Sequence, residues 1–380
     1  MTSLPTVLFV NPGTEAYGSE RSMLRLLQAR RFHAEVVCPV AGTLEMELIQ
    51  LGVKIHPLNF NRYTLQSNLF WHIGFFCRFC RILKQSRPDV IVINLDGNTP
   101  WVTLAATLAG IPIVRFCRFE FKQPIRWQDK WSWLKAMAII CPSDTVRQQV
   151  LAWNPKHFRG RCYRLYDPFV GQVAIPGEIS NFRTRLGLEN ERIVGFVGRL
   201  HRGKRIDTAI EALAVVLKQI PSVRLVIFGG TNNLESERSY KLELQLLANN
   251  LRIGESVMFV GHSRAEEMLA AFASFDAIIL PSEAESFGMV LMEAWAQGTP
   301  TVASDTGGCG EITRKSGAGY LSSVGDVGSF AAHLLELLTH SETARAMGER
   351  GKSWVAQNCS LSDYSAAFQA ILTSCIRDSK

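Results

Sequence analysis

The densest group of residues that could do chemistry runs from Pro281 to Glu293. Two carboxylates, Glu283 and Glu285, stand in a polar turn that follows an apolar segment (277–280), and a stretch of helical period then begins near Gly288. The first turn of that helix would leave backbone N–H groups unpaired, which suits an anion or a set of sugar hydroxyls. These groups belong to Phe287, Gly288, Met289 and Val290. Composition alone leaves a second interpretation open, in which the carboxylates are solvated acids at the start of a helix.

A second group follows the apolar segment 192–197. It begins with Gly198, Arg199 and Leu200 and brings two glycines and four cations into eight residues, ending with Lys204 and Arg205. Because arginine offers phosphate a bidentate fork and lysine a point charge, the loop predicts a phosphate-binding turn. The Gly-Lys-Ser/Thr ending of a Walker loop is missing. An exposed basic loop remains the alternative.

Glycines follow two further strand-like segments of the second half. Gly307 and Gly308 come after 300–304, with Glu311 nearby, and Gly261 precedes His262 after 257–260. A glycine pair allows the backbone to approach a ligand closely. We therefore expect these turns to belong to the same site.

The first half offers weaker candidates. Gly18, Ser19 and Glu20 stand in the first turn between a strand and a helix, but the Gly-x-Gly-x-x-Gly spacing of a nicotinamide-cofactor site is missing. Three other polar residues follow later strand-like segments and are predicted to line a pocket: Asp96, Arg118 and Glu120.

The elements that must position these residues alternate along the whole chain. Short apolar, β-branched runs are followed by longer stretches of helical period, which predicts an α/β fold of two doubly wound parallel-sheet, Rossmann-like domains. We predict the domains at residues 1–172 and 173–360, with a last helical segment in 361–380. In such sheets ligands bind outside the carboxyl ends of the strands, so the cleft between two facing domains is the expected site.

Charge is distributed unevenly between the two halves. Residues 1–170 contain 21 Lys+Arg against 11 Asp+Glu, and residues 171–380 contain 20 against 23. A basic half indicates an anionic partner, for which nucleic acid, an acidic membrane surface and a phosphorylated substrate are open, as is a merely uneven surface. The absence of a known binding motif makes nucleic acid the weakest of these.

The segment Asn68–Lys84 combines several aromatic residues with three cations. It could lie on an anionic bilayer or form a core helix with a cationic rim. Nine scattered cysteines and no secretory signal predict a cytoplasmic location, and no run is long and apolar enough to span a membrane.

In the second half these motifs resemble those of retaining GT-B glycosyltransferases of family 4 (glycosyl transferases group 1). The glutamate pair Glu285 and Glu293, preceded by Pro-Ser and followed by Phe-Gly, is similar to the strongest signature of that family. Three further motifs follow the family order: Gly198-Arg199-Leu200 with Lys204, Glu211-Ala212-Leu213, and Gly307-Gly308 with Glu311.

The resemblance implies a nucleotide-sugar donor (UDP-, GDP- or ADP-linked) held by the second domain, with retention of anomeric configuration. Arg199 and Lys204 would hold the diphosphate, Glu285 with the backbone after it the sugar hydroxyls, and Glu293 the ribose. No metal ion and no cofactor are expected. The last helix is expected to cross back to the first domain.

On the acceptor side the chain departs from the family. Tyr17-Gly18-Ser19-Glu20 replaces the usual Gly-Gly turn, and no histidine stands near Phe116–Glu120. The expected acceptor is a glycan or a lipid-linked molecule used in making a cell-surface polysaccharide or glycolipid. The alternative is a non-catalytic GT-B module that binds a nucleotide-sugar or scaffolds a complex.

Overall fold

The computed structural model describes residues 4–40, 42–60, 69–121, 127–230, 235–261, 263 and 265–379. The chain divides into two compact units, which are described separately. Unit 1 comprises Met1–Pro168 with Ser360–Lys380, and unit 2 comprises Phe169–Cys359. The first boundary lies slightly before the predicted one at 172/173.

Unit 1 is built on a parallel sheet of seven strands in the order β3-β2-β1-β4-β5-β6-β7. Its inner strands are short and buried on both faces, as the continuous apolar runs predict for a parallel sheet. The strands are β1 (Thr6–Val10), β2 (His33–Cys38), β3 (Lys54–Pro57), β4 (Val90–Ile93), β5 (Ile113–Phe116), β6 (Ala138–Cys141) and β7 (Cys162–Arg164).

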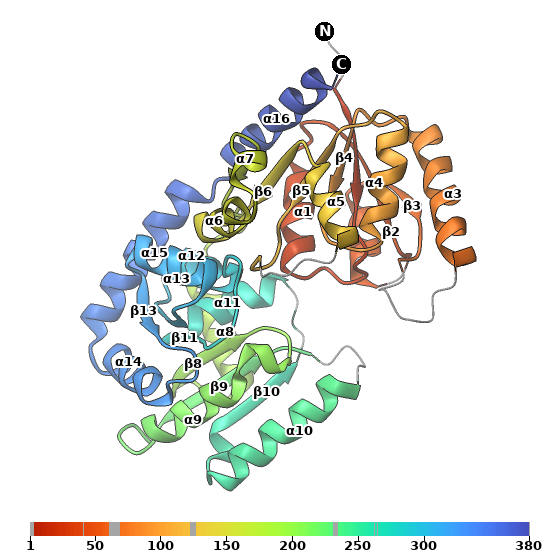
Figure 1. The fold of residues 1–380 in the computed structure, drawn as a ribbon. Helices are drawn as coiled ribbons and strands as arrows, with labels where there is room; N and C mark the ends of the chain where they lie inside the picture. Colours follow the sequence, from red (N-terminus) through yellow and green to blue (C-terminus); the bar gives the residue numbers. More distant parts are fainter. Residues whose placement is uncertain are drawn as a thin grey trace. The chain divides into compact units, whose positions relative to one another are not determined.

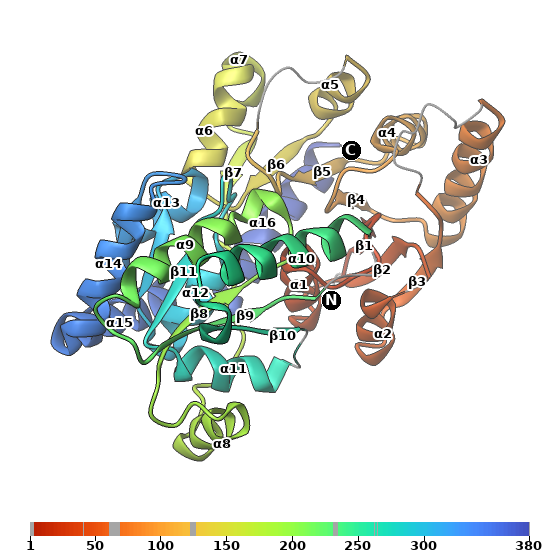
Figure 2. The ribbon, with the colours of Figure 1, turned by 90° about the horizontal axis from the view of Figure 1, so that it is seen from below.

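Helices cover both faces of this sheet. On one face α1 (Gly18–Gln28), α2 (Thr43–Gln50) and α16 (Leu361–Asp378) pack on a core that includes Phe9, Val92 and Phe368. On the other face lie α3 (Leu69–Ser86) and α4 (Thr99–Leu108), followed by α5 (Trp127–Leu134), α6 (Asp144–Trp153) and α7 (Pro155–Phe158). Figure 2 shows α3 and α4 across the sheet from α1 and α2.

Unit 2 repeats the architecture with six parallel strands in the order β10-β9-β8-β11-β12-β13 (Figure 1). These are β8 (Arg192–Val197), β9 (Val223–Phe228), β10 (Val257–Gly261), β11 (Ala277–Leu280), β12 (Thr301–Ser304) and β13 (Gly319–Ser322). One face carries α9 (Ile206–Val216), α10 (Glu235–Asn250) and α14 (Val327–Thr339), and the other carries α8 (Pro176–Leu186), α11 (Ala265–Ser274) and α12 (Met289–Gln297). Two helices, α13 (Gly307–Ser316) and α15 (Ser341–Asn358), complete the unit.

Both strand orders have a topological switch point, where the chain leaves the sheet in opposite directions from two neighbouring strands. It lies between β1 and β4 in unit 1 and between β8 and β11 in unit 2. Ligands of doubly wound sheets bind in the crevice that such a point opens at the carboxyl ends of the strands. The loops after these four strands therefore decide what each unit can bind.

Candidate functional site

Two loops of unit 2 meet at the switch point between β8 and β11. Lys204 ends the short 3-10 helix η1 (Arg202–Lys204) after β8, and its Nζ forms an ion pair with the carboxylate of Glu285 in the loop after β11. The two side chains are only 24% and 15% exposed. The backbone joins the same loops, because the N–H of Glu283 donates to the carbonyl of Gly203 at 2.9 Å. The structure thus unites a cation and a carboxylate that we predicted for one site.

The loop after β8 is shaped by its own residues. Nδ1 of His201 accepts a hydrogen bond from the N–H of Gly203 at 3.1 Å. Arg205 is left-handed (φ 48°) at the N-cap of α9 and forms an ion pair with Asp207 at 3.1 Å. These contacts make the turn that carries Lys204 toward Glu285.

The remaining cations of this loop differ in their surroundings. Arg202 donates to both carboxylate oxygens of Glu243 on α10, each at 2.6 Å, and lies 5.2 Å from the ring centroid of Tyr240. Arg199 lies exposed directly after Gly198, whose N–H donates to the carbonyl of Phe228 at 2.9 Å. Arg202 thus ties the loop to α10, and the ligand role of Arg199 remains a prediction.

A third loop, between β12 and α13, supports the backbone around Glu285. The N–H of Gly308 donates to the carbonyl of Glu285 at 2.7 Å. A Cβ on Gly308 would stand 2.1 Å from the carbonyl oxygen of Ser286, so only glycine permits this packing. Gly307 has φ 46°, in the left-handed region that favours glycine. At Gly308 the backbone closely approaches the chain itself, and the expected contact of the glycine pair with a ligand stays a prediction.

Helix α12 starts beside this turn. Its N-cap is Gly288, with φ 101°, which has no side chain to cap the N–H groups of Met289 and Val290. Phe287, just before it, is 2% exposed and anchors the turn in the interior. Glu293 is half-buried on α12. These positions agree with the predicted helix start, and the ligand roles remain predictions.

One buried thiol at this site was not singled out from the sequence. The Sγ of Cys309 donates to the carbonyl oxygens of Ser304 and Thr306 at 3.2 and 3.0 Å. Burial and the nearby Glu285 carboxylate raise the pKa of this thiol to about 12. Cys309 is therefore an unreactive packing residue in the first turn of α13. Its position between Gly308 and Gly310, in the first turn of α13, is the sequence feature that could have revealed it.

Gly261, at the end of β10, has φ 90° and open space around its Cα. The adjoining His262, named with it above, lies outside the described residues.

At the switch point of unit 1 amides and carboxylates gather. Glu20, on the first turn of α1, is 2% exposed and accepts a hydrogen bond from the Ser19 hydroxyl at 2.8 Å. Asn94, after β4, donates to the amide oxygen of Asn11, after β1, at 2.8 Å. Gly18 begins α1. Asn11 and Asn94 were not predicted, because a lone amide after a strand has no periodicity or motif to reveal it.

Arg118, predicted to line a pocket, is only 4% exposed and is bound in the interior of unit 1. Its guanidinium forms an ion pair with Asp167 at 2.6 Å and donates to Oδ1 of Asn94 at 3.2 Å. Ser22 donates to the same Asp167 carboxylate. Burial opposes the charge of Arg118, but Asp167 and Tyr364 together outweigh burial, and the pKa of Arg118 is raised. These contacts tie β5 to α1 and to the segment that leaves the unit.

Asp96, also predicted to line a pocket, has 41% of its side chain accessible and forms an ion pair with Arg115 on β5. Arg115 is 1% exposed, donates to the Ser132 hydroxyl at 2.8 Å and lies 4.2 Å from the ring centroid of Trp133. Burial lowers the pKa of Arg115. A half-exposed carboxylate is thus fixed from beneath by a buried cation. Glu120 is half-buried.

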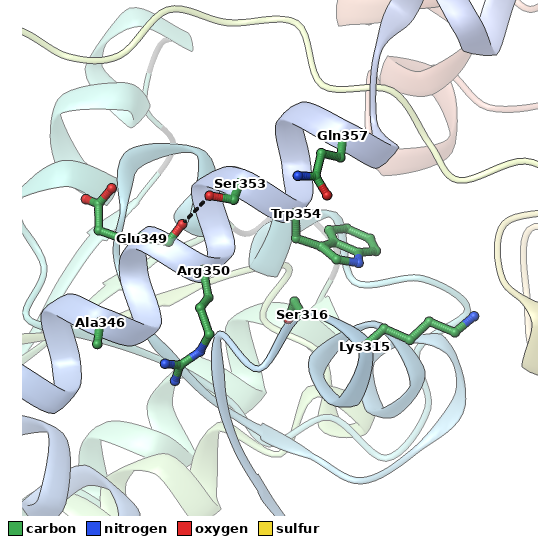
Figure 3. A pocket seen from close by; sticks show the side chains of 8 residues that line it. All are labelled: Lys315, Ser316, Ala346, Glu349, Arg350, Ser353, Trp354 and Gln357. Carbon is green, nitrogen blue, oxygen red and sulfur yellow. Dashed lines mark hydrogen bonds between the residues drawn. The ribbon is translucent and has the colours of Figure 1, made fainter.

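A cavity of about 360 Å³ lies elsewhere in unit 2, between α13 and α15. Figure 3 shows Trp354 at its centre with Lys315 and Arg350 on either side. Arg350 donates to the carbonyl of Gly317 at 2.7 Å. None of the predicted site residues lines this cavity.

Within the described ranges no three His, Cys, Asp or Glu side chains gather as metal ligands would. Nor does any described helix combine the length and the apolar character needed to cross a lipid bilayer.

Two family models match the chain. The model of Glycosyl transferases group 1 matches residues 178–354, within unit 2. The model of the Glycosyl transferase 4-like domain matches residues 20–159, within unit 1.

Among curated proteins, the chain is 30% identical to the N-acetyl-alpha-D-glucosaminyl L-malate synthase of Bacillus anthracis over 55% of this chain and 52% of that protein. It is 35% identical to the D-inositol 3-phosphate glycosyltransferase of Nocardia farcinica over 50% of this chain and 44% of that protein. The chain thus spans about half the length of the curated relatives it matches.

Solved structures share the fold over nearly the whole chain. Anabaena HepE, solved in complex with UDP and glucose, has a TM-score of 0.86 at 20% identity and covers 97% of this chain and 100% of its own. WaaG, a glycosyltransferase involved in lipopolysaccharide biosynthesis, has a TM-score of 0.69 at 17% identity and covers 97% of this chain and 99% of its own. At these identities the likeness concerns the fold alone.

Proposed function

Because this chain belongs to the glycosyl transferases group 1 and has their GT-B fold, we propose that it transfers a sugar from a nucleoside-diphosphate sugar to a glycan or lipid-linked acceptor. The transfer retains the anomeric configuration and uses no metal ion. The observation that carries the proposal is the Lys204–Glu285 ion pair at the switch point of unit 2.

The cations of the β8 loop suit a diphosphate leaving group. As the bond between the sugar and the phosphate breaks, negative charge collects on the phosphate oxygens, and fixed cations stabilise that charge. The Lys204 ammonium has three N–H donors. It can keep one on Glu285 and direct the others to phosphate, while the exposed Arg199 adds a bidentate fork. This pair of cations would do the work that a divalent ion does in other transferases.

Glu285 is held in a way that suits binding of sugar hydroxyls. Its carboxylate is fixed by Lys204, and its carbonyl by the N–H of Gly308. A carboxylate held by an ion pair, on a backbone that is itself fixed, can accept hydrogen bonds from sugar hydroxyls without reorganising. Behind it, the uncapped start of α12 offers N–H donors to the same ligand. We assign the ribose to Glu293 on the same helix.

For the acceptor we propose a glycan or lipid-linked molecule that carries negative charge. The support for this choice is that the names of two relatives contain anionic molecules, L-malate and D-inositol 3-phosphate. Glu20 and Asp96, at the switch point of unit 1, are assigned to the hydroxyl groups of the acceptor, from which their carboxylates can accept hydrogen bonds. The reaction takes place in the cytoplasm.

The experiment compares two cations of one loop. Product formation is measured with UDP-, GDP- and ADP-linked sugars for the wild type, Lys204→Gln and Arg202→Gln. Losing a preorganised group at the leaving phosphate should lower kcat about a hundredfold or more. Arg202→Gln should stay near wild type, because Arg202 pairs with Glu243 on α10.

Equal loss in both variants would show that Lys204 has no special role. Donor binding without any turnover in the wild type would favour the alternative, a non-catalytic module that binds nucleotide-sugars.

A further inference from the structure

Helix α3 presents an unusual face to solvent. Its buried side contributes Phe75 and Phe79, 3% and 0% exposed, to the core of unit 1. On the opposite side Phe70 is 82% exposed and Ile73 46% exposed, and Cys77 is exposed as well. The helix therefore packs in the core, as one interpretation of this segment predicted, and it also leaves large apolar side chains uncovered.

Exposed cations follow these apolar side chains along the helix. Arg78, Arg81 and Lys84 are all exposed in the second half of α3, and the helix contains no Asp or Glu. Positions 70, 73, 77, 81 and 84 recur at helical spacing, so they form one stripe along the helix. We call these residues and Arg78 the α3 stripe. It is apolar at its first end and cationic at the other.

The apolar end of the α3 stripe lies near the proposed acceptor residues. His72 stacks on Trp101 of α4, with ring centroids 5.7 Å apart. Helix α4 follows directly from the loop after β4 that holds Asp96. Figure 1 shows α3 beside α4 at the margin of unit 1. The stripe thus begins at the edge of the sheet where unit 1 would receive an acceptor.

We propose that the α3 stripe docks unit 1 on an anionic lipid bilayer, with Phe70 and Ile73 entering the headgroup region and the three cations contacting lipid phosphates. Apolar side chains combined with Lys and Arg on one helix face are the pattern of an interfacial helix. A second copy of the chain fits poorly, because stable interfaces bury upward of about 1,200 Å² and two cationic faces repel each other. The inference deepens the proposed function, on which it rests for the lipid-linked acceptor.

The test is cosedimentation of the full chain with vesicles, either of phosphatidylcholine alone or of equal parts phosphatidylcholine and phosphatidylglycerol. Wild type should bind the anionic vesicles, and less tightly at high salt. The triple variant Arg78→Gln, Arg81→Gln, Lys84→Gln should lower the binding constant about a hundredfold. The pair Phe70→Ser, Ile73→Ser should weaken binding at both salt concentrations.

Matched controls come from unit 2. The triple variant Lys218→Gln, Arg252→Gln, Arg345→Gln changes the net charge equally at exposed positions. The pair Leu242→Ser, Leu246→Ser removes two leucines, each 61% exposed, from α10. Both controls should bind as wild type does. Thermal melting checks that each variant is folded. If the Phe70→Ser, Ile73→Ser variant is unstable, the proposal is decided by the α3 charge variant alone.

Absence of wild-type binding, or equal loss in the α3 and control charge variants, would overturn the proposal. If the wild type bound no vesicles but formed a dimer, and if Phe70→Ser, Ile73→Ser abolished that dimer, the partner of the α3 stripe would be a second copy of the chain. Donor turnover is measured in parallel without vesicles. Turnover without vesicle binding refutes only this inference, and vesicle binding without turnover refutes only the proposed function.

Discussion

Replacing Gly308 by alanine would place a Cβ 2.1 Å from the carbonyl oxygen of Ser286. Carbon and oxygen approach no closer than about 3.3 Å even in C–H···O contacts, so the two backbones must separate by roughly 1 Å. That movement breaks the 2.7 Å hydrogen bond from the N–H of Gly308 to the carbonyl of Glu285. Overpacking of this kind costs about 1–3 kcal/mol of stability, and the lost bond about 1 kcal/mol more.

The larger consequence should fall on catalysis. A shift of about 1 Å in a positioned group can cost about a hundredfold in rate, and Gly308→Ala moves the turn that carries Glu285. We therefore expect kcat with the preferred donor sugar to fall about a hundredfold, together with a lower midpoint of thermal unfolding. Turnover and thermal unfolding are measured on the same preparation.

Gly177→Ala is the matched control. Gly177 lies in α8 of unit 2, where a Cβ would meet nothing within 4 Å. This variant should keep both turnover and stability. If Gly308→Ala also kept both, the α13 turn would not position Glu285 and the account of the donor site would be wrong.

Two further predictions concern buried groups. Asp167→Asn should leave the Arg118 charge buried without compensation and lower the free energy of unfolding by about 3–5 kcal/mol. The control is Asp378→Asn, in an exposed pair with Arg377, which should lower it by less than about 1 kcal/mol. Both values are measured by urea unfolding. Because burial raises the pKa of Cys309 to about 12, this residue stays a thiol at neutral pH. Mass spectrometry of the native chain after treatment with iodoacetamide should therefore find Cys309 unmodified and the exposed Cys77 alkylated. Early alkylation of Cys309 would contradict its assigned burial.

The fold and the family could be predicted from the sequence because their signals are local. Apolar runs such as 90–93 and 277–280 are strands buried on both faces, and the structure confirms the two parallel sheets. The motifs around Lys204 and Glu285 identified the family, which the family models confirm. In a parallel sheet, the loop that follows a strand lies at the carboxyl end of the sheet. This was enough to predict that Lys204 and Glu285, which follow two different strands, lie near one crevice.

Side-chain partners that lie far apart in the chain could not be predicted in this way. Asn11 and Asn94 are separated by 83 residues, and nothing in either stretch points to the other. Arg115 stands in a strand whose pattern predicts an apolar residue, and its partner Asp96 shows why a cation is tolerated there. The glycine at 308 could be singled out from the sequence, but the backbone of Ser286, which it approaches, could not.

The two switch points share one topology and differ in chemistry, which bears on the meaning of the basic first half. In unit 2 the switch point carries Lys204 beside Glu285, the two residues of the proposed donor site. In unit 1 the cations near the switch point, Arg115 and Arg118, are buried and each is neutralised by a carboxylate. The positive charge of α3, by contrast, is exposed and has no acid on the same helix. It follows that the charge of α3 is better suited to an anionic bilayer in which the acceptor is embedded than to the group of the acceptor that receives the sugar. Neutralising α3 should therefore raise KM for an acceptor embedded in anionic vesicles and leave KM for a detergent-solubilised short-chain acceptor unchanged.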